Sequence, residues 1–315
     1  MFLEVLPLPD ITVSVVIPTL NAAAYLAELL DSLQNQKYLS PFEIILVESG
    51  STDGTVAIAS RYPEVRIVPI ADFSHGRSRN LGASHATGDI VVFLTQDALP
   101  QDDGWLKNLL APFADQRVAA TYSRQVPRPD APFTERFFLS TRFPAGPAVY
   151  RQKSREDEVL TFEKVFFSNV SSAVRRFVLV EYPFDETLIM SEDQQLSRDL
   201  LEAGYAVVYA PESVVIHSHN YSLPMVFKRY FDSVYSLTEI FPSHGFGTSA
   251  SMGGRYLAKE FRYVLKNYPQ KLGYYFLYTA AKTFGTLLGH FVKVLPRFLV
   301  RKFSMHKYHW NNQSG

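Results

Sequence analysis

Apolar and polar residues alternate in blocks along the first third of the chain. Four short blocks rich in Ile and Val predict buried strands, at 11–19, 42–48, 65–70 and 89–95. Turn residues and helical spacing lie between them, and helices are expected after Asn21, after Thr52 or Asp53, and over 76–86. This alternation predicts an α/β fold with a mostly parallel sheet and helices on both faces.

The pattern loosens in the middle of the chain and becomes regular again near residue 166. Residues 118–125 predict a further strand, whereas 126–160 are rich in Pro, Arg and Phe and predict a long irregular segment. Later blocks predict a helix over about 192–203 that Gly204 closes, followed by two short strands at 205–210 and 213–219.

The last third, from Leu223 to Trp310, has helical spacing and many aromatic residues. Its apolar stretches are interrupted by Lys271, Lys282 and Lys293 and fall short of the roughly 18 residues that span a bilayer. Residues 274–303 mix Tyr, Phe and Leu with regularly placed cations, which is typical of a helix in the membrane interface. A helical subdomain with solvated basic residues explains the pattern equally well, so both interpretations stay open.

Composition excludes some classes of protein and reveals an asymmetric charge. Of the 315 residues, 47% are apolar, as in a packed globular protein, and none is cysteine, which excludes disulfides and thiolate metal sites. The net charge is zero, yet the residues from Arg255 onward include eleven Lys or Arg and one acid. Such a basic end predicts an anionic partner, and its Tyr, Phe and Leu favour lipid over nucleic acid. Residues 1–10 lack the basic start of a signal peptide.

Polar side chains stand at the ends of the first two predicted strands, where open α/β sheets bind ligands. Pro18, Thr19 and Asn21 end the first strand and open a helix, whose free N–H groups suit a nucleotide. Asn21 alone is equally well explained as an ordinary helix cap. Glu48 ends the second strand.

Two further groups of charged residues lie at predicted helix starts. His75, Arg77 and Arg79 stand where a nucleotide diphosphate would be favoured, although solvation explains either arginine alone. Glu192 and Asp193 begin a later helix, where acids are expected in any case, but a carboxylate there can also take a proton from an attacking hydroxyl.

A single carboxylate follows the fourth predicted strand. Gln96 and Asp97 come directly off this strand, and one carboxylate is a weak site for Mg²⁺ or Mn²⁺ unless other ligands join it. His217, on a late strand, can supply one, and His219 alternates to the same face as a second candidate. A strand end with solvated imidazoles is the alternative.

Taken together, five segments between residue 12 and about residue 220 resemble the inverting family 2 glycosyltransferases, which have the GT-A fold. They are "VSVVIPTLNAAAYLAELLDSL", "ILVESGSTDGT", "HGRSRNLGASHATGDIVVFLTQDA", "SEDQQLSRDLLEAGY" and "HSH". The "FSHGRSRNLGA" and "TQDA" segments are most similar to the rhamnosyltransferase branch, whose donor is dTDP-L-rhamnose.

The resemblance implies roles for the residues at the strand ends. It implies that Asp193, the second acid of the "ED" pair with Glu192, is the catalytic base, and that Asp97 and His217 bind Mn²⁺ or Mg²⁺. Glu48 stands where the family has an acid, usually Asp, that binds the pyrimidine. The other residues assigned to the donor are Pro18, Thr19, Asn21, Arg77, Arg79 and Gln96.

The implied function is inverting transfer of a sugar, L-rhamnose, to a saccharide or lipid-linked saccharide in surface polysaccharide synthesis. The enzyme would work in the cytoplasm, peripherally at the inner membrane face, and bind no nucleic acid. A catalytically silent nucleotide-sugar-binding scaffold is the alternative, while a Rossmann dehydrogenase is disfavoured because "IPTLNAAAYL" lacks the G-x-G-x-x-G turn. The expected domains are a catalytic one at 1–222, with donor part 12–125 and acceptor part 126–222, and a basic helical region at 223–315.

Overall fold

The computed structural model describes residues 11–38, 40–241 and 246–311, with the backbone alone for 246–252 and 311. The expectation about a signal peptide in residues 1–10 lies outside this description. The chain divides into two compact units, and the first comprises residues up to 128, 142–186 and 192–217. The second comprises 129–141, 187–191 and all residues from Ser218 onward. Its long C-terminal part therefore begins a few residues before the expected boundary at 222/223.

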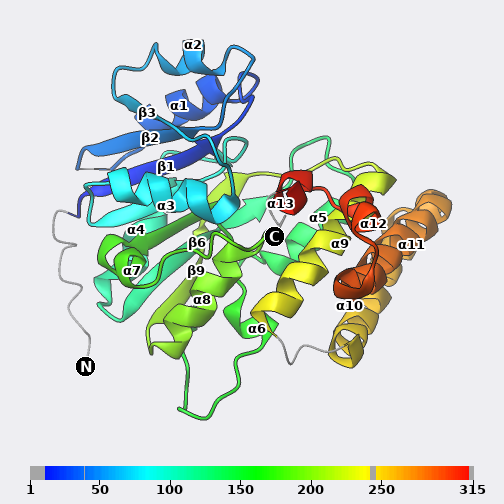
Figure 1. Cartoon of the computed structure of the whole chain (residues 1–315). Coiled ribbons are helices and arrows are strands. Elements are labelled where there is room, and N and C mark those ends of the chain that lie inside the picture. The colour runs from blue at the N-terminus through cyan, green and yellow to red at the C-terminus, as the bar shows by residue number, and fades with distance from the viewer. Residues whose placement is uncertain (1–10, 39, 242–245, 312–315) are drawn as a thin grey trace. The chain divides into compact units, whose positions relative to one another are not determined.

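The first unit is built on a nine-stranded mixed sheet in the order β3-β2-β1-β4-β8-β6-β9-β5, with β7 also paired to β9 (Figure 1). The strands are β1 Val13–Thr19, β2 Phe42–Glu48, β3 Val65–Pro69, β4 Ile90–Leu94, β5 Leu99–Pro100, β6 Val118–Val126, β7 Val149–Arg151, β8 Ser171–Arg175 and β9 Ala206–Ile216. β1 to β4 are mutually parallel, β8 is antiparallel to both β4 and β6, and β9 is parallel to β6. The carboxyl ends of β1, β2, β4, β6 and β9 therefore meet at one edge, where β8 begins.

Helices cover both faces of this sheet, as the alternation predicts. Val13, Val15 and Ile17 of β1 face a core shared with α1 (Leu26–Gln34), α2 (Thr55–Ala59), α4 (Trp105–Leu110) and η1 (Ala111–Ala114). Val16 points to the opposite face, towards α3 (His75–His85), where a Cβ on Gly82 would come within 2.2 Å of it. The remaining helices of the unit are α6 Phe162–Val165, α7 Arg176–Glu181 and α8 Glu192–Glu202.

Most predicted elements of this unit are confirmed, with corrections at their ends. The four early strands, the helix α3 and α8 with its terminal Gly204 (φ 86°) are present. The prediction that Asn21 caps the first helix is wrong, because α1 begins at Leu26 after Tyr25, with no side-chain cap. The second helix begins at Thr55, later than predicted.

Two predictions for the middle of the chain are wrong. The segment 126–160 contains α5 (Phe133–Arg142) and the short strand β7. The two strands expected at 205–210 and 213–219 are one strand, β9. It continues through Pro211 because its register against β6 shifts between Ser123 and Arg124, which accommodates the extra residues as a bulge.

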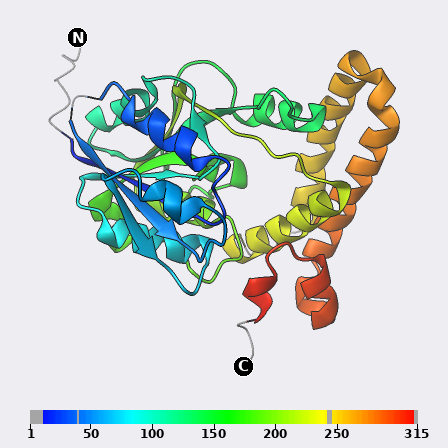
Figure 2. The same ribbon diagram turned by 90° about the horizontal axis from the view of Figure 1, so that it is seen from above.

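The second unit is helical, as its spacing predicts, and its helices from α9 onward run from yellow to red in Figure 2. Its helices after α5 are α9 Leu223–Ile240, α10 Phe246–Asn267, η2 Pro269–Lys271, α11 Leu272–Gly289, η3 Val292–Val294, α12 Arg297–Phe303 and α13 Lys307–Asn311. The interfacial segment expected over 274–303 is therefore divided among α11, η3 and α12. Among the described residues, none of the helices is both long and apolar enough to cross a bilayer.

Glycines let α11 approach α9 closely. A Cβ on Gly285 would lie 2.3 Å from the carbonyl oxygen of Phe227, and one on Gly289 would lie 2.7 Å from that of Phe231. Beside this contact the ammonium group of Lys282 is buried and lies 2.9 Å from a carboxylate oxygen of Glu260. Lys282 therefore does not belong to the exposed cations that the sequence pattern suggested.

Candidate active site

The strand ends of the first unit bring Asp97 and His217 together, as expected. Asp97 lies in the turn after β4 and His217 directly follows β9, and 3.6 Å separates Asp97 Oδ2 from His217 Nε2. The ligand atoms of Asp97, His217 and His219, two residues along the chain, all lie within 4.8 Å of one another. A carboxylate oxygen and two imidazole nitrogens are suitable ligands for Mn²⁺.

The orientation of His217 is set by Gln125, at the end of β6. Gln125 donates its amide N–H to Ser168 Oγ at 2.9 Å, so its oxygen, 3.1 Å from His217 Nδ1, accepts a hydrogen bond from that nitrogen. In the neutral imidazole, the lone pair of His217 Nε2 then points towards the Asp97 carboxylate. A cation bound between the nitrogen and the carboxylate oxygen would stabilise these two electron-rich atoms. Two ligands about 2.1 Å from one ion are separated by about 3–4 Å, so the observed 3.6 Å fits.

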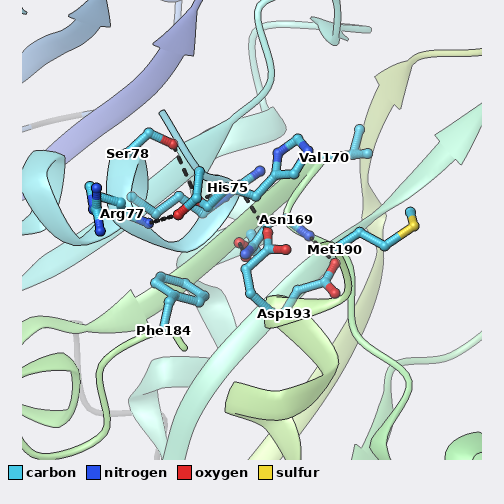
Figure 3. Close-up of polar contacts among 12 residues, drawn as sticks. His75, Arg77, Ser78, Asn169, Val170, Phe184, Met190 and Asp193 are labelled. Carbon is cyan, nitrogen blue, oxygen red and sulfur yellow. Dashed lines mark hydrogen bonds and ion pairs between the residues drawn. The ribbon is translucent and has the colours of Figure 1, made fainter. Parts of the chain in front are cut away.

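Asp193 lies in the first turn of α8, with its carboxylate held by backbone N–H groups (Figure 3). Asn169 N–H donates to one oxygen at 3.2 Å and Gln194 N–H to the other at 2.8 Å. Burial of the carboxyl group and the negative charge of Glu192 raise the pKa of Asp193 to about 7, against the opposing effects of Asn169, Arg79 and Gln194. A carboxylate with this pKa is well suited to accept a proton near neutral pH.

Glu192 is buried and points to α3. Its carboxylate lies 2.8 Å from Arg79 Nη1, and the two side chains are each 6% exposed. The same nitrogen donates to the His75 carbonyl oxygen at 2.9 Å. Arg79, which the sequence assigned to the donor, therefore contacts the neighbour of Asp193.

A three-residue segment before β8 connects these groups, and no sequence pattern marked it as part of the site. Ser168 contacts Gln125, which orients His217, and Asn169 donates to Asp193. Val170 accepts a hydrogen bond from Thr95 N–H at 3.0 Å, two residues before Asp97. Residues 168–170 thus connect the candidate general base and the candidate metal ligands to the start of β8. Figure 3 shows Asn169 next to Asp193.

Some residues assigned to the donor are engaged in the loops at the same edge. Gln96 makes two hydrogen bonds to the backbone of Leu20, at 2.7 and 3.0 Å. Asn21, with φ of 50°, accepts a hydrogen bond from Thr52 N–H at 2.9 Å and so joins the loop after β1 to that after β2. Both residues shape the loops where the strands end.

The other residues assigned to the sugar-nucleotide donor differ in their burial and in their contacts. Pro18 and Thr19 lie within β1, and Thr19 is 2% exposed and donates to Ile17 O. Burial tends to raise the pKa of Glu48, but hydrogen bonds from Ser51 and Gly50 outweigh it and lower that pKa. Arg77 is more exposed and its Nε lies 3.0 Å from Glu186. Glu48 is thus ionised and held at the strand end.

The sequence matches a known family. Residues 14–182, more than half of the chain, match the model of Glycosyl transferase family 2. The chain belongs to this family. This glycosyltransferase is 37% identical to the O-antigen chain rhamnosyltransferase RfbN of Salmonella typhimurium, over 95% of the chain and 96% of that protein. It is 35% identical to the O-antigen chain rhamnosyltransferase WbaN of Salmonella anatum, with the same coverage.

Solved structures agree with the fold. A mannosyltransferase from Pyrobaculum calidifontis, solved with GDP-Man and Mn²⁺, has a TM-score of 0.60 and 20% identity, covering 89% of this chain and 86% of its own. At this identity the likeness supports the fold alone, and it confirms the expected GT-A architecture.

In this glycosyltransferase, five of the twelve buried polar atoms that lack a partner among the residues that the structure describes lie in or near the candidate site. Within the described part of the chain, no hydrogen-bond partner is found for Ser49 Oγ, Arg79 Nε, Thr95 Oγ1, Asn169 Nδ2 and Gln194 Oε1. Ser49 and Thr95 follow β2 and β4, and Asn169 precedes β8. Buried polar groups are normally satisfied, so these atoms are available to a substrate or to water at this edge.

Proposed function

We propose that the enzyme transfers L-rhamnose from dTDP-L-rhamnose, with inversion, to a saccharide or lipid-linked saccharide acceptor in the synthesis of a surface polysaccharide. The observation that carries this proposal is the convergence of Asp193, Asp97 and His217 on one edge of the sheet through residues 168–170. The two O-antigen rhamnosyltransferases, each matching 95% of the chain, support the choice of sugar and pathway class.

Asp193 would act as the general base. Its carboxylate accepts the proton of an acceptor hydroxyl while that oxygen forms a bond to the anomeric carbon of the donor sugar. The bond from this carbon to the diphosphate oxygen breaks, and the electron pair leaves with the nucleoside diphosphate. Attack on the face opposite the leaving group inverts the anomeric centre, so a single carboxylate suffices at the reacting carbon.

Asp97 and His217, with His219 beside them, would hold Mn²⁺ or Mg²⁺. When bound, the cation supplies a Lewis acid for the negative charge of the diphosphate. Gln125 would keep the ligand nitrogen of His217 turned towards Asp97. The nature of the ligands favours Mn²⁺, because imidazole suits Mg²⁺ poorly.

The remaining residues would bind or position the donor. Glu48 would accept hydrogen bonds from the pyrimidine ring of the donor, and Arg77 would attract its diphosphate. Gln96 and Asn21, together with Pro18 and Thr19, would shape the loops around the nucleotide.

Burial and the contact with Glu192 favour a positioning role for Arg79. Asn169, whose buried Nδ2 has no partner among the described residues, is well placed to donate to a substrate oxygen beside Asp193.

We place the enzyme in the cytoplasm, at the inner face of the membrane, because the basic and aromatic end of the chain suits an anionic lipid surface. This location is independent of the transfer chemistry.

A donor screen tests the function. Nucleoside diphosphate release from dTDP-L-rhamnose and from UDP- and GDP-sugars is measured with and without Mn²⁺, for the wild type and for Asp97→Ala and Asp193→Asn. We expect metal-dependent release that prefers dTDP-L-rhamnose and is lost in both variants. Wild-type turnover in both variants would refute the residue roles. Donor binding without any release, across metals and acceptors, would favour the non-catalytic scaffold instead.

A further inference from the structure

A shallow apolar groove lies within the second unit, between α9, α11 and α12. It encloses about 480 Å³, and its lining includes Phe227, Leu277, Ala281, Phe284, Leu288 and Phe303. Leu277 and Phe284 are each 59% exposed. An open groove lined by large apolar side chains is a costly surface to leave in water, so it is expected to have a binding partner.

The groove uses a side of α11 that the packing of the unit leaves open. At 3.6 residues per turn, Leu277, Ala281, Phe284 and Leu288 form one stripe along the helix. The adjacent stripe contains Gly285, whose close contact with the backbone of α9 is part of the packing. The groove is therefore bounded by a closely packed helix pair.

The outer surface of α11 is uncharged. The only charged residue among its 18 is Lys282, and its ammonium group is buried against Glu260 and three tyrosine rings. Phe276, like Phe284, is a large apolar residue of this helix with 59% of its surface exposed. A helix surface with apolar and aromatic side chains and no charge suits the hydrocarbon of a bilayer.

Exposed cations follow α11 along the chain, in η3 and α12. Between Phe291 and Phe303, exposed Val294 and Phe298 alternate with exposed cations. These cations are Lys293, Arg297, Arg301 and Lys302. Residues 261–315 contain no acid at all, and of these four cations only Lys293 is in an ion pair that the structure describes, with Glu239 at 2.9 Å. Arg297 donates one hydrogen bond to the carbonyl oxygen of Trp310 at 3.0 Å, which leaves its other N–H groups for an anion. Apolar side chains next to unopposed cations are complementary to anionic lipid headgroups above acyl chains.

We propose that the groove and the exposed faces of α11 and α12 dock on an anionic bilayer, with lipid acyl chains in the groove and Arg297, Arg301 and Lys302 at the phosphates. The docking rests on the membrane location proposed above and is independent of the sugar and of the catalytic residues. It identifies which side of the second unit meets the lipid.

The absence of cysteine makes a direct test available. Phe284→Cys carries an environment-sensitive fluorophore, and Phe177→Cys on α7, a residue of the first unit with the same 59% exposure, is the matched control. With phosphatidylglycerol-containing vesicles, we expect the label at residue 284 to shift to the blue and to be quenched by brominated acyl chains. The label at residue 177 should show neither effect.

Binding is then measured by co-sedimentation. Leu277→Glu with Phe284→Glu should lower the vesicle partition coefficient by about tenfold or more, because both side chains lose their burial. Arg301→Glu with Lys302→Glu should do so only when the lipid is anionic. Phe177→Glu should bind like the wild type.

Two outcomes would overturn the proposal. One is equal partitioning of the groove variant and the wild type. The other is a blue shift at residue 284 that depends on protein concentration without vesicles, which would indicate a second copy of the chain in the groove. Nucleoside diphosphate release with a water-soluble acceptor, measured on the same variants, separates failure of the docking from failure of the proposed transfer activity.

Discussion

Each unit of this glycosyltransferase contains a buried ion pair, and their surroundings differ. Arg79 and Glu192, in the first unit, adjoin Asp193, an acid with a raised pKa, and Arg79 Nε has no partner among the described residues. Lys282, in the second unit, contacts both oxygens of Glu260, and its ammonium group lies 4.5 to 5.5 Å from three tyrosine ring centres.

The difference shows that a buried ion pair does not by itself mark a functional site. Pairing stabilises buried charges in either setting, because an unpaired charge in the interior is costly. The pair in the first unit adjoins polar groups that still need partners, whereas the pair in the second unit is enclosed by aromatic rings. We therefore expect substitutions at the first site to change chemistry as well as stability, and substitutions at the second to change stability alone.

The largest effect is expected from Asp193→Asn. Removing a general base typically lowers turnover by about 10²–10⁴-fold, and the amide keeps the shape of the side chain. Nucleoside diphosphate release is the measurement, and the thermal midpoint should hardly change. Asp199→Asn, on the same helix, is the control and should keep near-normal turnover. A fully active Asp193→Asn enzyme would contradict a chemical role for the site beside the Arg79–Glu192 pair, and the two ion pairs would then no longer differ in function.

Lys282→Met should cost about 3–5 kcal/mol in the free energy of unfolding, because Glu260 is left as an unpaired buried charge. Urea unfolding followed by circular dichroism measures this loss. The double change with Glu260→Gln should recover most of it, and Lys266→Met, at an exposed lysine of α10, should be nearly neutral. A folded Lys282→Met enzyme with strongly reduced turnover would contradict a purely structural role.

Gln125→Leu tests the orientation of His217. Losing the residue that orients a metal-binding histidine typically weakens the metal by about 10–100-fold. Calorimetric titration with Mn²⁺ alone measures this, with Gln152→Leu as the control at an exposed glutamine whose side chain donates to the Gly204 carbonyl oxygen. Unchanged affinity in Gln125→Leu would argue against His217 as a ligand.

The smallest effect concerns pH. The proposed base Asp193 must be unprotonated to act, so we expect turnover to rise with pH around the value of about 7 to which burial and Glu192 raise the pKa of Asp193. Glu192→Gln removes a neighbouring negative charge, which lowers this pKa and should move the acidic limb down by about one pH unit. The pH profile of turnover is the measurement, and a limb that stays in place would show that Glu192 does not act on the base.

Much of the fold could be predicted from short-range patterns. Each buried element can be recognised from its own short segment, because burial imposes a period on its apolar residues. Examples are the runs of Ile and Val in β1, β2 and β4 and the leucine stripe of α1. The same holds for Gly204, whose φ of 86° ends α8. The middle of the chain was harder: α5 lies among prolines, and the bulge in β9 depends on its partner β6.

The candidate site could be predicted only in part. Asp97, His217 and Asp193 stand at element ends in recognisable motifs, and the sequence selected them. Residues 168–170 were missed because their contribution is mainly through backbone groups and small polar side chains, which carry no signal of their own.

By itself, the sequence determined the α/β and helical regions, the family and the acids and imidazoles of the candidate site, since these follow from local periodicity and motifs. Only the tertiary structure decided which of the charged residues meet. Arg79 contacts Glu192, 113 positions away, and Lys282 turns inwards to Glu260, whereas Arg301 stays exposed. The physical reason is that a charge takes its partner and its degree of burial from the elements packed around it, and the order of residues along the chain does not record that packing.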